Sequence, residues 1–496
     1  MTFDDEHAVK YPSQPPLLSD SKNPHVMIVG AGLAGLLLAI LLGKAGIPYQ
    51  IYERAKEVKP LGAVMSLNAG ILPALEQLGL YEELLKISLP VTGEFKIYNS
   101  DISLIFSPKN DLLLSKVPRE RIHLSKKVIS LEQNRGGAMI RCADGTTYHG
   151  DILVGADGAY SSVRQALYKR LTKAGTLPLS DADELNKGFI CMVGITKALD
   201  PIKYPGVDAN DANINQIIGN DSLYSWSAFT VPGNRICWNV KRQLATVKEA
   251  TEHKFRNSEW GPETSEAMIK EVRDFRIPFG NNTLGDLIDA TPRESISRVF
   301  LEDKLFDTWN HGRTVLIGDA CHKLLPSAGL GAVTAMQDAV VLANCLYEMK
   351  GLAPTDIDVA LSEFKAARYS NVKAQFLRMV VFNWLPESIK MKGAFKGMEF
   401  RPQASFLPQI RARGSAPVLP QKPSQRYQDE QKKIAAQGNN NHVEAVWFAF
   451  SVPGNRICWN VISQLDSLDA AERQKLKNAE WSPESNDAMI AEVKDF

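Results

Sequence analysis

A glycine pattern near the start of the chain is the feature that most limits how this sequence can fold. An apolar run over residues 25–30 is followed by Gly30, Gly32 and Gly35, and a leucine-rich helical pattern occupies residues 33–45. A strand that turns sharply into a helix needs glycine at the turn and where the helix packs against the strand. A phosphate group can then approach the backbone beside Gly32, facing the helix N-terminus.

A second short apolar segment completes this unit. Tyr49–Tyr52 reads as a strand, and Glu53 follows it directly. Strand, helix and strand at this spacing form one parallel βαβ unit, and an acidic residue after the second strand can accept hydrogen bonds from a ribose. The pattern predicts a Rossmann-like domain that binds a dinucleotide. It does not distinguish FAD from NAD.

A second motif occupies residues 152–164, with the sequence ILVGADGAYSSVR. An apolar strand runs into Asp157 and then into a helix that begins at Ser161 or Ser162. The aspartate and glycine of this motif are suited to a cofactor-binding loop. A turn followed by a capped helix would explain the same residues, so both interpretations stay open.

A third motif covers residues 314–346, where a strand ends at Asp319 and a glycine-rich loop leads into a helix near Gly331. A carboxylate at the end of a strand can bind ribityl or ribose hydroxyls. The free N–H groups at the start of the helix can hold an anion or a carbonyl oxygen. The alternative is a loop that needs its glycines only to turn.

The three motifs, in this order, resemble the group A FAD-dependent monooxygenases, the family of para-hydroxybenzoate hydroxylase and salicylate hydroxylase, which includes prenyl-epoxidising relatives. The resemblance covers about residues 25–385. It implies an α/β fold in which a Rossmann-like FAD-binding domain carries an inserted mixed β-sheet substrate domain. It also implies FAD as cofactor, NAD(P)H as electron donor and O2 as oxidant. A flavin C4a-hydroperoxide would then hydroxylate or epoxidise an aromatic or prenylated small molecule.

The resemblance also implies roles for individual residues around FAD. Glu53 would bind the adenosine ribose, and Gly62 and Ala63 would lie along the cofactor. Asp157 would serve both FAD and the pyridine nucleotide, and Asp319 would bind the ribityl chain. These assignments add to the three glycines of the first motif.

Two further positions belong to the flavin end. Ala332 would lie beside the flavin ring, and Arg119 would occupy the position of the family's flavin-contacting arginine, with a residue that merely follows a gap in the family pattern as the alternative. In the family this arginine begins a helix of the form R-x-x-L-x-x-x-L. Here only residues 120–125 separate it from the next strand-like segment, so the helix is missing. The gap raises the alternative of a catalytically impaired flavin- or nucleotide-binding protein.

No conventional catalytic pair stands out, because the cofactor carries the difficult chemistry in such enzymes. Residues 226–240 are predicted to form a hairpin around a Pro-Gly-Asn turn. Tyr224, just before this hairpin, is the candidate catalytic residue, with packing as its alternative. His322 could relay a proton, but a local hydrogen bond is favoured. An NAD-dependent dehydrogenase is the weaker enzyme alternative, since it leaves the third motif unexplained.

Composition excludes several classes of partner. The 496 residues carry a net charge of +1, which provides no field for nucleic acid, and no metal-ligand pattern occurs. The six cysteines lack paired spacing and predict reduced thiols. No apolar run is long enough to span a bilayer. We therefore expect a cytoplasmic protein, with residues 376–385 leaving open an association with a membrane surface.

The predicted domains follow from these motifs. Residues 1–24 form a disordered arm, residues 25–187 and 276–400 the FAD-binding domain with its C-terminal helices, residues 188–275 the substrate domain, residues 401–445 a linker, and residues 446–496 a partial duplicate of residues 225–275.

The duplicate rests on one repeated sequence. VPGNRICWNV occurs at residues 231–240 and again at residues 452–461. Residues 226–275 and 447–496 align without a gap, and 29 of 50 positions are identical. Two copies separated by a complete flavin motif do not form a repeat architecture, which needs three or more adjoining units. We predict a partial duplication that contributes nothing to the fold. The alternative is a second hairpin that docks on the first domain or swaps between two chains.

Overall fold

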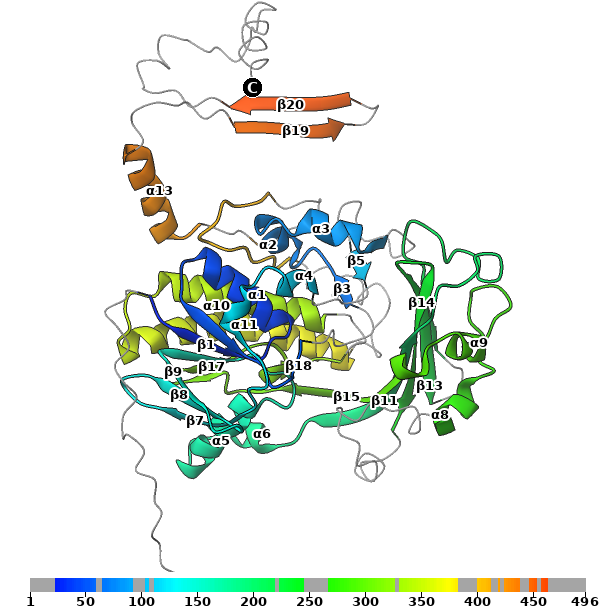
Figure 1. Cartoon of the computed structure of the whole chain (residues 1–496), viewed down its shortest axis with the longest axis horizontal. Helices are drawn as coiled ribbons and strands as arrows, with labels where there is room; N and C mark the ends of the chain where they lie inside the picture. The colour runs from blue at the N-terminus through cyan, green and yellow to red at the C-terminus, as the bar shows by residue number, and fades with distance from the viewer. Residues whose placement is uncertain are drawn as a thin grey trace, which may run out of the picture. The chain divides into compact units, whose positions relative to one another are not determined.

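A computed structural model describes residues 23–58, 65–91, 103–106, 111–218, 223–244, 266–325, 330–381, 399–411, 418–419, 423–437, 446–452 and 456–462. The chain divides into two compact units, Met1–Tyr427 and Gln428–Phe496. The first unit contains the main sheets and helices (Figure 1). Residues 1–22 of the predicted arm lie outside the described part.

The first unit is built around a six-stranded sheet with β1 (Val26–Val29) near its centre. The strand order is β16 (Asn310–His311), β17 (Thr314–Leu316), β10 (Ile152–Gly155), β1, β2 (Tyr49–Tyr52) and β6 (Ile122–His123). Neighbouring strands from β17 to β6 are parallel, and only β16 is antiparallel. All four residues of β1 are buried, as expected for a strand covered on both faces.

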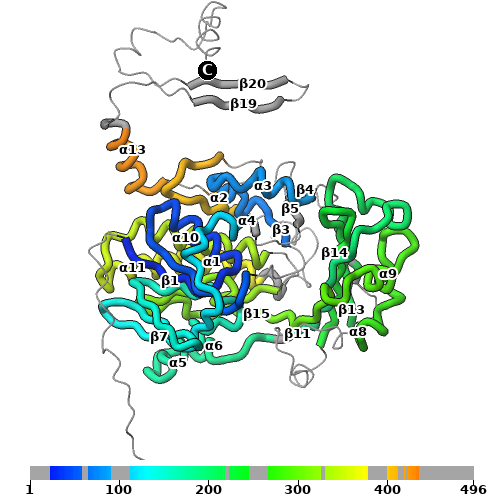
Figure 2. Tube along the Cα trace, viewed as in Figure 1, coloured from blue at the N-terminus to red at the C-terminus, as the bar shows by residue number. Residues whose placement is uncertain are grey.

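Helices and smaller sheets complete this core. Helix α1 (Leu33–Lys44) packs beside α10 (Gly331–Glu348), although they are far apart in the sequence (Figure 2). The remaining elements are α2 (Leu72–Gln77), α3 (Tyr81–Lys86), α4 (Asp111–Leu114), α5 (Ser162–Lys173), α6 (Leu179–Ala182), α11 (Pro354–Val381), the sheet of β3 (Met65–Leu67), β5 (Ser103–Phe106) and β4 (Leu89–Val91), and the sheet of β7 (Val128–Gln133), β8 (Ala138–Cys142) and β9 (Thr147–Gly150).

Five strands of a second six-stranded sheet are inserted between β10 and β17 of the first, and its sixth strand, β18 (His322–Lys323), follows β17. Its order is β12 (Ile214–Ile218), β13 (Tyr224–Val231), β14 (Arg235–Gln243), β11 (Asn186–Ile195), β15 (Ser297–Leu305) and β18. This arrangement confirms the Rossmann-like domain with an inserted sheet. The inserted sheet was predicted to be mixed, but every pairing between its described strands is antiparallel.

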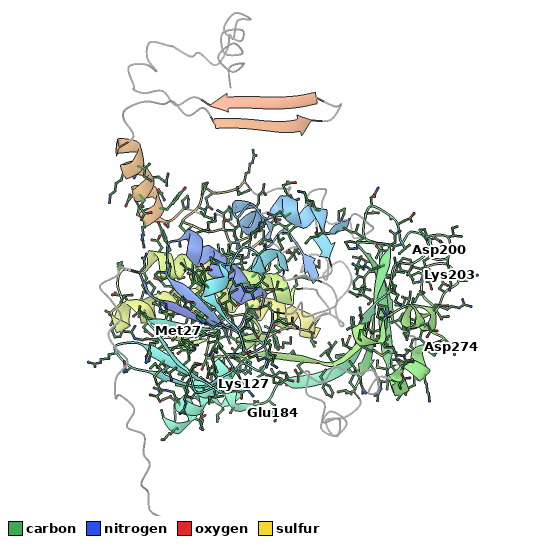
Figure 3. All side chains as sticks on the ribbon, viewed as in Figure 1. Met27, Lys127, Glu184, Asp200, Lys203 and Asp274 are labelled. Atoms are coloured by element: carbon green, nitrogen blue, oxygen red, sulfur yellow. The ribbon has the colours of Figure 1, made fainter. Side chains whose placement is uncertain are left out.

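The predicted domain boundary at residue 275 needs correction. Helix α9 (Leu284–Asp289) and strand β15 follow that boundary, yet both belong to the inserted part. Their side chains share one core with α8 (Glu266–Val272) and with Trp238. The boundary was missed because the pairing of β15 with β11 joins residues more than a hundred positions apart. In Figure 3, Lys203 and Asp274 are labelled on this inserted part and Met27 in the first core.

The hairpin predicted over residues 226–240 is confirmed. Val231 pairs with Arg235, which leaves Pro232, Gly233 and Asn234 in the turn. Gly233 and Asn234 have φ values of 88° and 54°, a left-handed conformation that these two residue types tolerate best. The position of this turn could therefore be predicted from its residue types alone.

The predicted linker over residues 401–445 is also corrected, because its first part packs on the core. Arg401, Ala404 and Phe406 are buried. Gln77 donates to the carbonyl oxygens of Ala404 and Pro408, and its own carbonyl accepts the Ala404 N–H. We call residues 399–411 the strap. The sequence did not predict the strap, because its composition is polar and the side chains that contact it are distant in the sequence.

The second unit contains the repeated sequence. Strands β19 (Val446–Val452) and β20 (Arg456–Ile462) pair antiparallel, with Trp447 opposite Val461. In the first copy Trp226 is opposite Val240, so the two hairpins share one register. Before them, α13 (Gln425–Gln437) replaces part of the predicted linker and crosses the boundary between the units. Among the described helices, none combines the length and hydropathy that crossing a membrane requires.

Candidate cofactor and active site

The first glycine motif forms a tight turn between β1 and α1. Gly30 has a φ of 106°, and a Cβ there would lie 2.5 Å from the carbonyl oxygen of Ala156. A Cβ on Gly35 would lie 2.1 Å from the carbonyl oxygen of Gly30, which explains the close packing of helix on strand. At Gly32 no atom lies within 4 Å of such a Cβ. The backbone at Gly32 is therefore open to a ligand.

Glu53 lies at the carboxyl end of β2 and faces this turn. Its two carboxylate oxygens accept the N–H groups of Ala31 at 2.8 Å and Ala55 at 2.9 Å. Each oxygen has a second lone pair, so a ribose hydroxyl can also be accepted. The predicted neighbours Gly62 and Ala63 lie outside the described residues.

Two long helices begin beside the third motif without a side-chain cap. Neither Gly32, at the start of α1, nor Leu330, at the start of α10, makes a side-chain capping hydrogen bond. A Cβ on Gly318 would lie 3.7 Å from Ala34 Cβ and 3.0 Å from Ala335 Cβ. The loop of Gly318 and Asp319 therefore lies between the N-terminal parts of both helices. The partial positive charges of both helix ends favour an anion here.

Asp319 lies in a short 3-10 turn, Gly318–Ala320, and is partly exposed. Its Oδ2 is 2.5 Å from Nζ of Lys323, the residue with which β18 pairs to β15. The same turn is thus joined to the inserted sheet. Ala332 is in the first turn of α10. The structure brings Asp319 and Ala332 to the same end of the first sheet as the Gly30 turn.

The second motif is linked to the third by hydrogen bonds, but its aspartate bonds only to the helix that follows it among the contacts described. Asp157 accepts from Ser161 Oγ at 2.5 Å and from the Ser162 N–H at 2.7 Å, at the start of α5. Arg164 is buried and donates to the carbonyl oxygens of Ala159 and Ala320, so it links this loop to the Asp319 loop. For Asp157 the geometry favours the capped helix over direct cofactor contact.

Arg119 is exposed on a 3-10 turn, Arg119–Arg121, which leads at once into β6. Between Arg119 and β7 the fully described chain contains no α-helix, only the 3-10 turn and the two residues of β6.

Tyr224 is directed away from the first core. It packs against Phe275, and its hydroxyl donates to Glu271 of α8. Burial and this hydrogen bond raise the pKa of Tyr224. Figure 1 shows α9 on the side of β13 and β14 farther from α1 and α10. The tyrosine therefore lies on the helix-covered face of the sheet, which suits its alternative role in packing.

The opposite face of this sheet, which we call the inner face, carries residues that the sequence did not single out. Ser227 and Asn239 are directly paired on it, with 3.5 Å between Ser227 Oγ and Asn239 Oδ1. Phe229 and Val193 pack near Leu89 of the first core. Strand alternation from Tyr224 places these residues on the other face. The face mixes apolar side chains with amide and hydroxyl groups.

A buried charged cluster supports the Asp319 loop from behind. Asp338 of α10 is fully buried and lies 2.5 Å from His322 Nε2 and 2.7 Å from Arg368 Nε. Burial alone would raise the pKa of the Asp338 carboxyl, but His322 and Arg368 bring it below its ordinary value. His322 thus makes the local hydrogen bond that the sequence favoured. A lone aspartate within the apolar pattern AMQDAVVLA was the signal that could have revealed this cluster.

The residues present fit FAD at this end of the first sheet. The open backbone at Gly32 and the uncapped start of α1 suit a pyrophosphate, and Glu53 suits a ribose. Asp319 and the uncapped start of α10 suit the flavin half. When bound, FAD supplies electron transfer between a reduced donor and an oxidant.

Comparison with known proteins agrees with this fit. The FAD binding domain family matches residues 23–182 and 212–358. The chain is 32% identical over 385 residues to the FAD-dependent monooxygenase ptmM of Penicillium ochrochloron, covering 71% of this chain and 86% of ptmM. It is 31% identical over 383 residues to the FAD-dependent monooxygenase paxM of Penicillium paxilli, covering 70% and 76%.

Solved structures share the fold. HpxO of Klebsiella pneumoniae in complex with FAD and uric acid has a TM-score of 0.55 at 21% identity, covering 76% of this chain and 92% of that one. The 2,6-dihydroxypyridine-3-hydroxylase of Arthrobacter nicotinovorans has a TM-score of 0.57 at 20% identity, covering 81% and 100%. With the family match and the two sequence relatives, these findings identify the chain as a member of the FAD-dependent monooxygenase family, with FAD as its cofactor.

Proposed function

We propose that this enzyme uses NAD(P)H and O2 to hydroxylate or epoxidise an aromatic or prenylated small molecule. The observation that carries the proposal is the similarity to ptmM over most of both chains, together with an intact Asp319 loop between two uncapped helices. One oxygen atom of O2 enters the substrate, and the other leaves as water with electrons from NAD(P)H. The protein's own task is to orient the substrate and exclude water.

We propose the inner face of the inserted sheet as the wall that orients the substrate. It is the face turned toward the first core, since Phe229 and Val193 pack near Leu89. Apolar side chains suit a prenyl or aromatic body, and the paired Ser227 and Asn239 suit one polar group on it. Tyr224 is not part of this proposal, because its hydroxyl is bonded to Glu271 on the other face.

The test uses the purified full chain with NADH or NADPH and a panel of phenols and prenylated aromatics. Oxidation of the reduced nucleotide should accelerate with an accepted substrate, and mass spectrometry should find one atom from 18O2 in the product. Stoichiometric FAD with no substrate-stimulated oxidation across the panel, or label arising from water, would contradict the proposal.

The missing helix after Arg119 favours a second candidate, a flavin-binding protein with impaired catalysis. Only a 3-10 turn and a two-residue strand connect Arg119 to β7. This candidate predicts bound FAD that reduces slowly and reoxidises without product. Anaerobic reduction by NADH and by NADPH, followed in the flavin absorbance, separates it from the active enzyme.

A further inference from the structure

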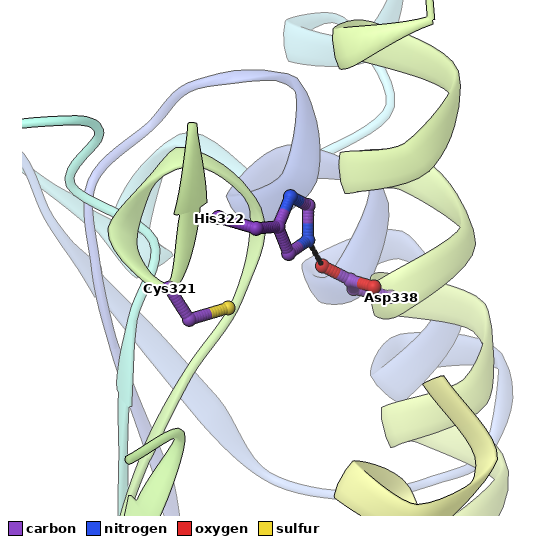
Figure 4. A group of neighbouring side chains, drawn as sticks. All are labelled: Cys321, His322 and Asp338. Atoms are coloured by element: carbon purple, nitrogen blue, oxygen red, sulfur yellow. Dashed lines mark hydrogen bonds and ion pairs between the residues drawn. The ribbon is translucent and has the colours of Figure 1, made fainter. Parts of the chain in front are cut away.

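The buried carboxylate of Asp338 gives its two oxygens different partners. Oδ2 accepts the backbone N–H of Gly318 at 2.8 Å and lies 2.5 Å from His322 Nε2, as Figure 4 shows for the histidine. Oδ1 accepts from Arg368 Nε at 2.7 Å. Because the carboxylate is ionised, His322 Nε2 is the donor in their contact. One oxygen therefore holds the Asp319 loop, and the other holds α11.

A metal site is the obvious alternative for this cluster, since Cys321, His322 and Asp338 lie close together. The surroundings oppose it. Asp338 is already paired with the Arg368 guanidinium, whose positive charge would repel a cation. The Cys321 thiol donates to the Leu316 carbonyl oxygen at 3.3 Å, and burial raises the pKa of that thiol well above its ordinary value. A neutral thiol is a poor metal ligand.

We infer that Asp338 is a positioning residue for FAD, acting through the backbone of the Asp319 loop. Gly318 has a φ of 61° and is confined between Ala34 and Ala335. Asp338 fixes the N–H of this residue, and Asp319 is the next residue in the chain. The inference rests on the proposed contact of Asp319 with FAD.

The chemistry of an amide makes this inference testable. In Asp338→Asn, one oxygen remains and the other position becomes an NH2 donor. If the amide oxygen faces Arg368, the NH2 faces the Gly318 N–H, and two donors meet. If the oxygen faces Gly318, the NH2 meets the Arg368 guanidinium instead. The amide oxygen can accept from Gly318 without a donor–donor contact on the other side only when the guanidinium is also removed.

The experiment measures FAD affinity and melting temperature in four variants of the full chain. These are Asp338→Asn, Asp338→Asn with Arg368→Met, Asp319→Asn, and Asn344→Ala as a control. Asn344 is on the same helix, and its side chain bonds Gln403 and Ser405 rather than the loop. Apo-protein is titrated with FAD by fluorescence quenching, and the visible circular dichroism of bound flavin reports its environment.

We expect Asp338→Asn to raise the FAD dissociation constant about tenfold, the loss that an unmet buried hydrogen bond can cause. Adding Arg368→Met should restore most of the affinity and the dichroism, whereas the melting temperature should stay below that of the wild type, because the Arg368 hydrogen bonds to Asn371 and to the Thr334 carbonyl oxygen are lost. Asn344→Ala should lower the melting temperature alone.

Affinity that follows the melting temperature in all variants would overturn the inference, since Asp338 would then be merely structural. An effect of Asp319→Asn without one of Asp338→Asn would overturn it as well. No effect of Asp319→Asn would instead contradict the proposed contact of Asp319 with FAD.

Discussion

At the scale of single residues, two aspartates that look alike in sequence have different surroundings. Both follow a strand of the first sheet and stand next to a glycine. Asp157 uses its oxygens on Ser161 and Ser162 at the start of α5, whereas Asp319 is partly exposed and bonded to Lys323. Because its carboxylate is not used for capping, Asp319 is the better candidate for a cofactor contact.

Asp319→Ala should therefore weaken FAD binding more than it alters folding. Hydrogen bonds to a charged group contribute about 1.5–3 kcal/mol, which is roughly a ten- to hundredfold change in the dissociation constant. Titration of apo-protein with FAD measures it, with Asp144→Ala, an exposed carboxylate on a surface turn, as control. Equal FAD dissociation constants for the wild type, Asp319→Ala and Asp144→Ala would show that Asp319 does not contribute to FAD binding.

The Asp338 carboxyl predicts a defined pH dependence of stability. Its pKa lies below the ordinary value of 3.8 in the folded protein, so its contribution is fully present above that value and is lost as the pH falls through the folded pKa. The melting-temperature difference between wild type and Asp338→Asn should shrink as the pH falls from about 5 to below about 4. A difference that grows on acidification would contradict this.

The inner face offers a test on substrate. Asn239→Leu should raise the KM for an accepted substrate several-fold, because a polar group of the substrate loses its partner, and leave FAD affinity unchanged. Asn215→Leu is the matched control, since Asn215 on β12 pairs with Ala228 on the helix-covered face. Steady-state kinetics on both variants and the wild type measure the KM. Equal KM values for Asn239→Leu and the wild type would show that Asn239 is not part of the proposed wall.

At the scale of elements, we predict that the missing helix after Arg119 leaves the flavin end of the site without a segment that the family resemblance implies. Restoring an R-x-x-L-x-x-x-L segment after Arg119 should raise FAD occupancy or NADPH-driven turnover, because a helix there would cover the cofactor. The ratio of bound flavin to protein and the rate of NADPH oxidation measure the effect. A natural chain that already binds FAD stoichiometrically and turns over steadily would contradict the prediction.

At the scale of the whole molecule, the C-terminal part contains the strap, which packs on the core, and the partial duplicate, in which one hairpin is described. The duplicate contains one described hairpin, and an isolated hairpin is marginally stable in water. The strap is different. Gln337, next to Asp338, donates to the carbonyl oxygens of Gly70 and Phe400, and Arg368 stacks on Phe400. The strap therefore adjoins the cluster behind the Asp319 loop.

Two truncations follow from this division. A chain ending at Gly438 should keep the FAD content, melting temperature and activity of the full chain. A chain ending at residue 398 should lose FAD and melt earlier, since it loses the buried Arg401, Ala404 and Phe406. Calorimetry and flavin absorbance test both. Loss of FAD in the longer truncation would mean that the second VPGNRICWNV is a working part.

The sequence by itself determined what depends on neighbouring residues. We could predict β1, α1 and β2 because the spacing of apolar residues and the glycines at turns are local properties of the sequence. The hairpin around Pro-Gly-Asn was predictable for the same reason. The three motifs also predicted the FAD domain. In the structure the three loops lie at one edge of the first sheet, because they follow parallel strands.

Tertiary structure alone decided what depends on contacts across the chain. Only strand pairing assigned β15 to the inserted sheet, and only alternation within that sheet turned Tyr224 toward α8. The pairing of Asp338 with Arg368 joins two helices, and the strap is held by side chains such as Gln77. Local sequence carries no trace of such partners, because the free energy of a buried charge or amide depends on what folding brings beside it.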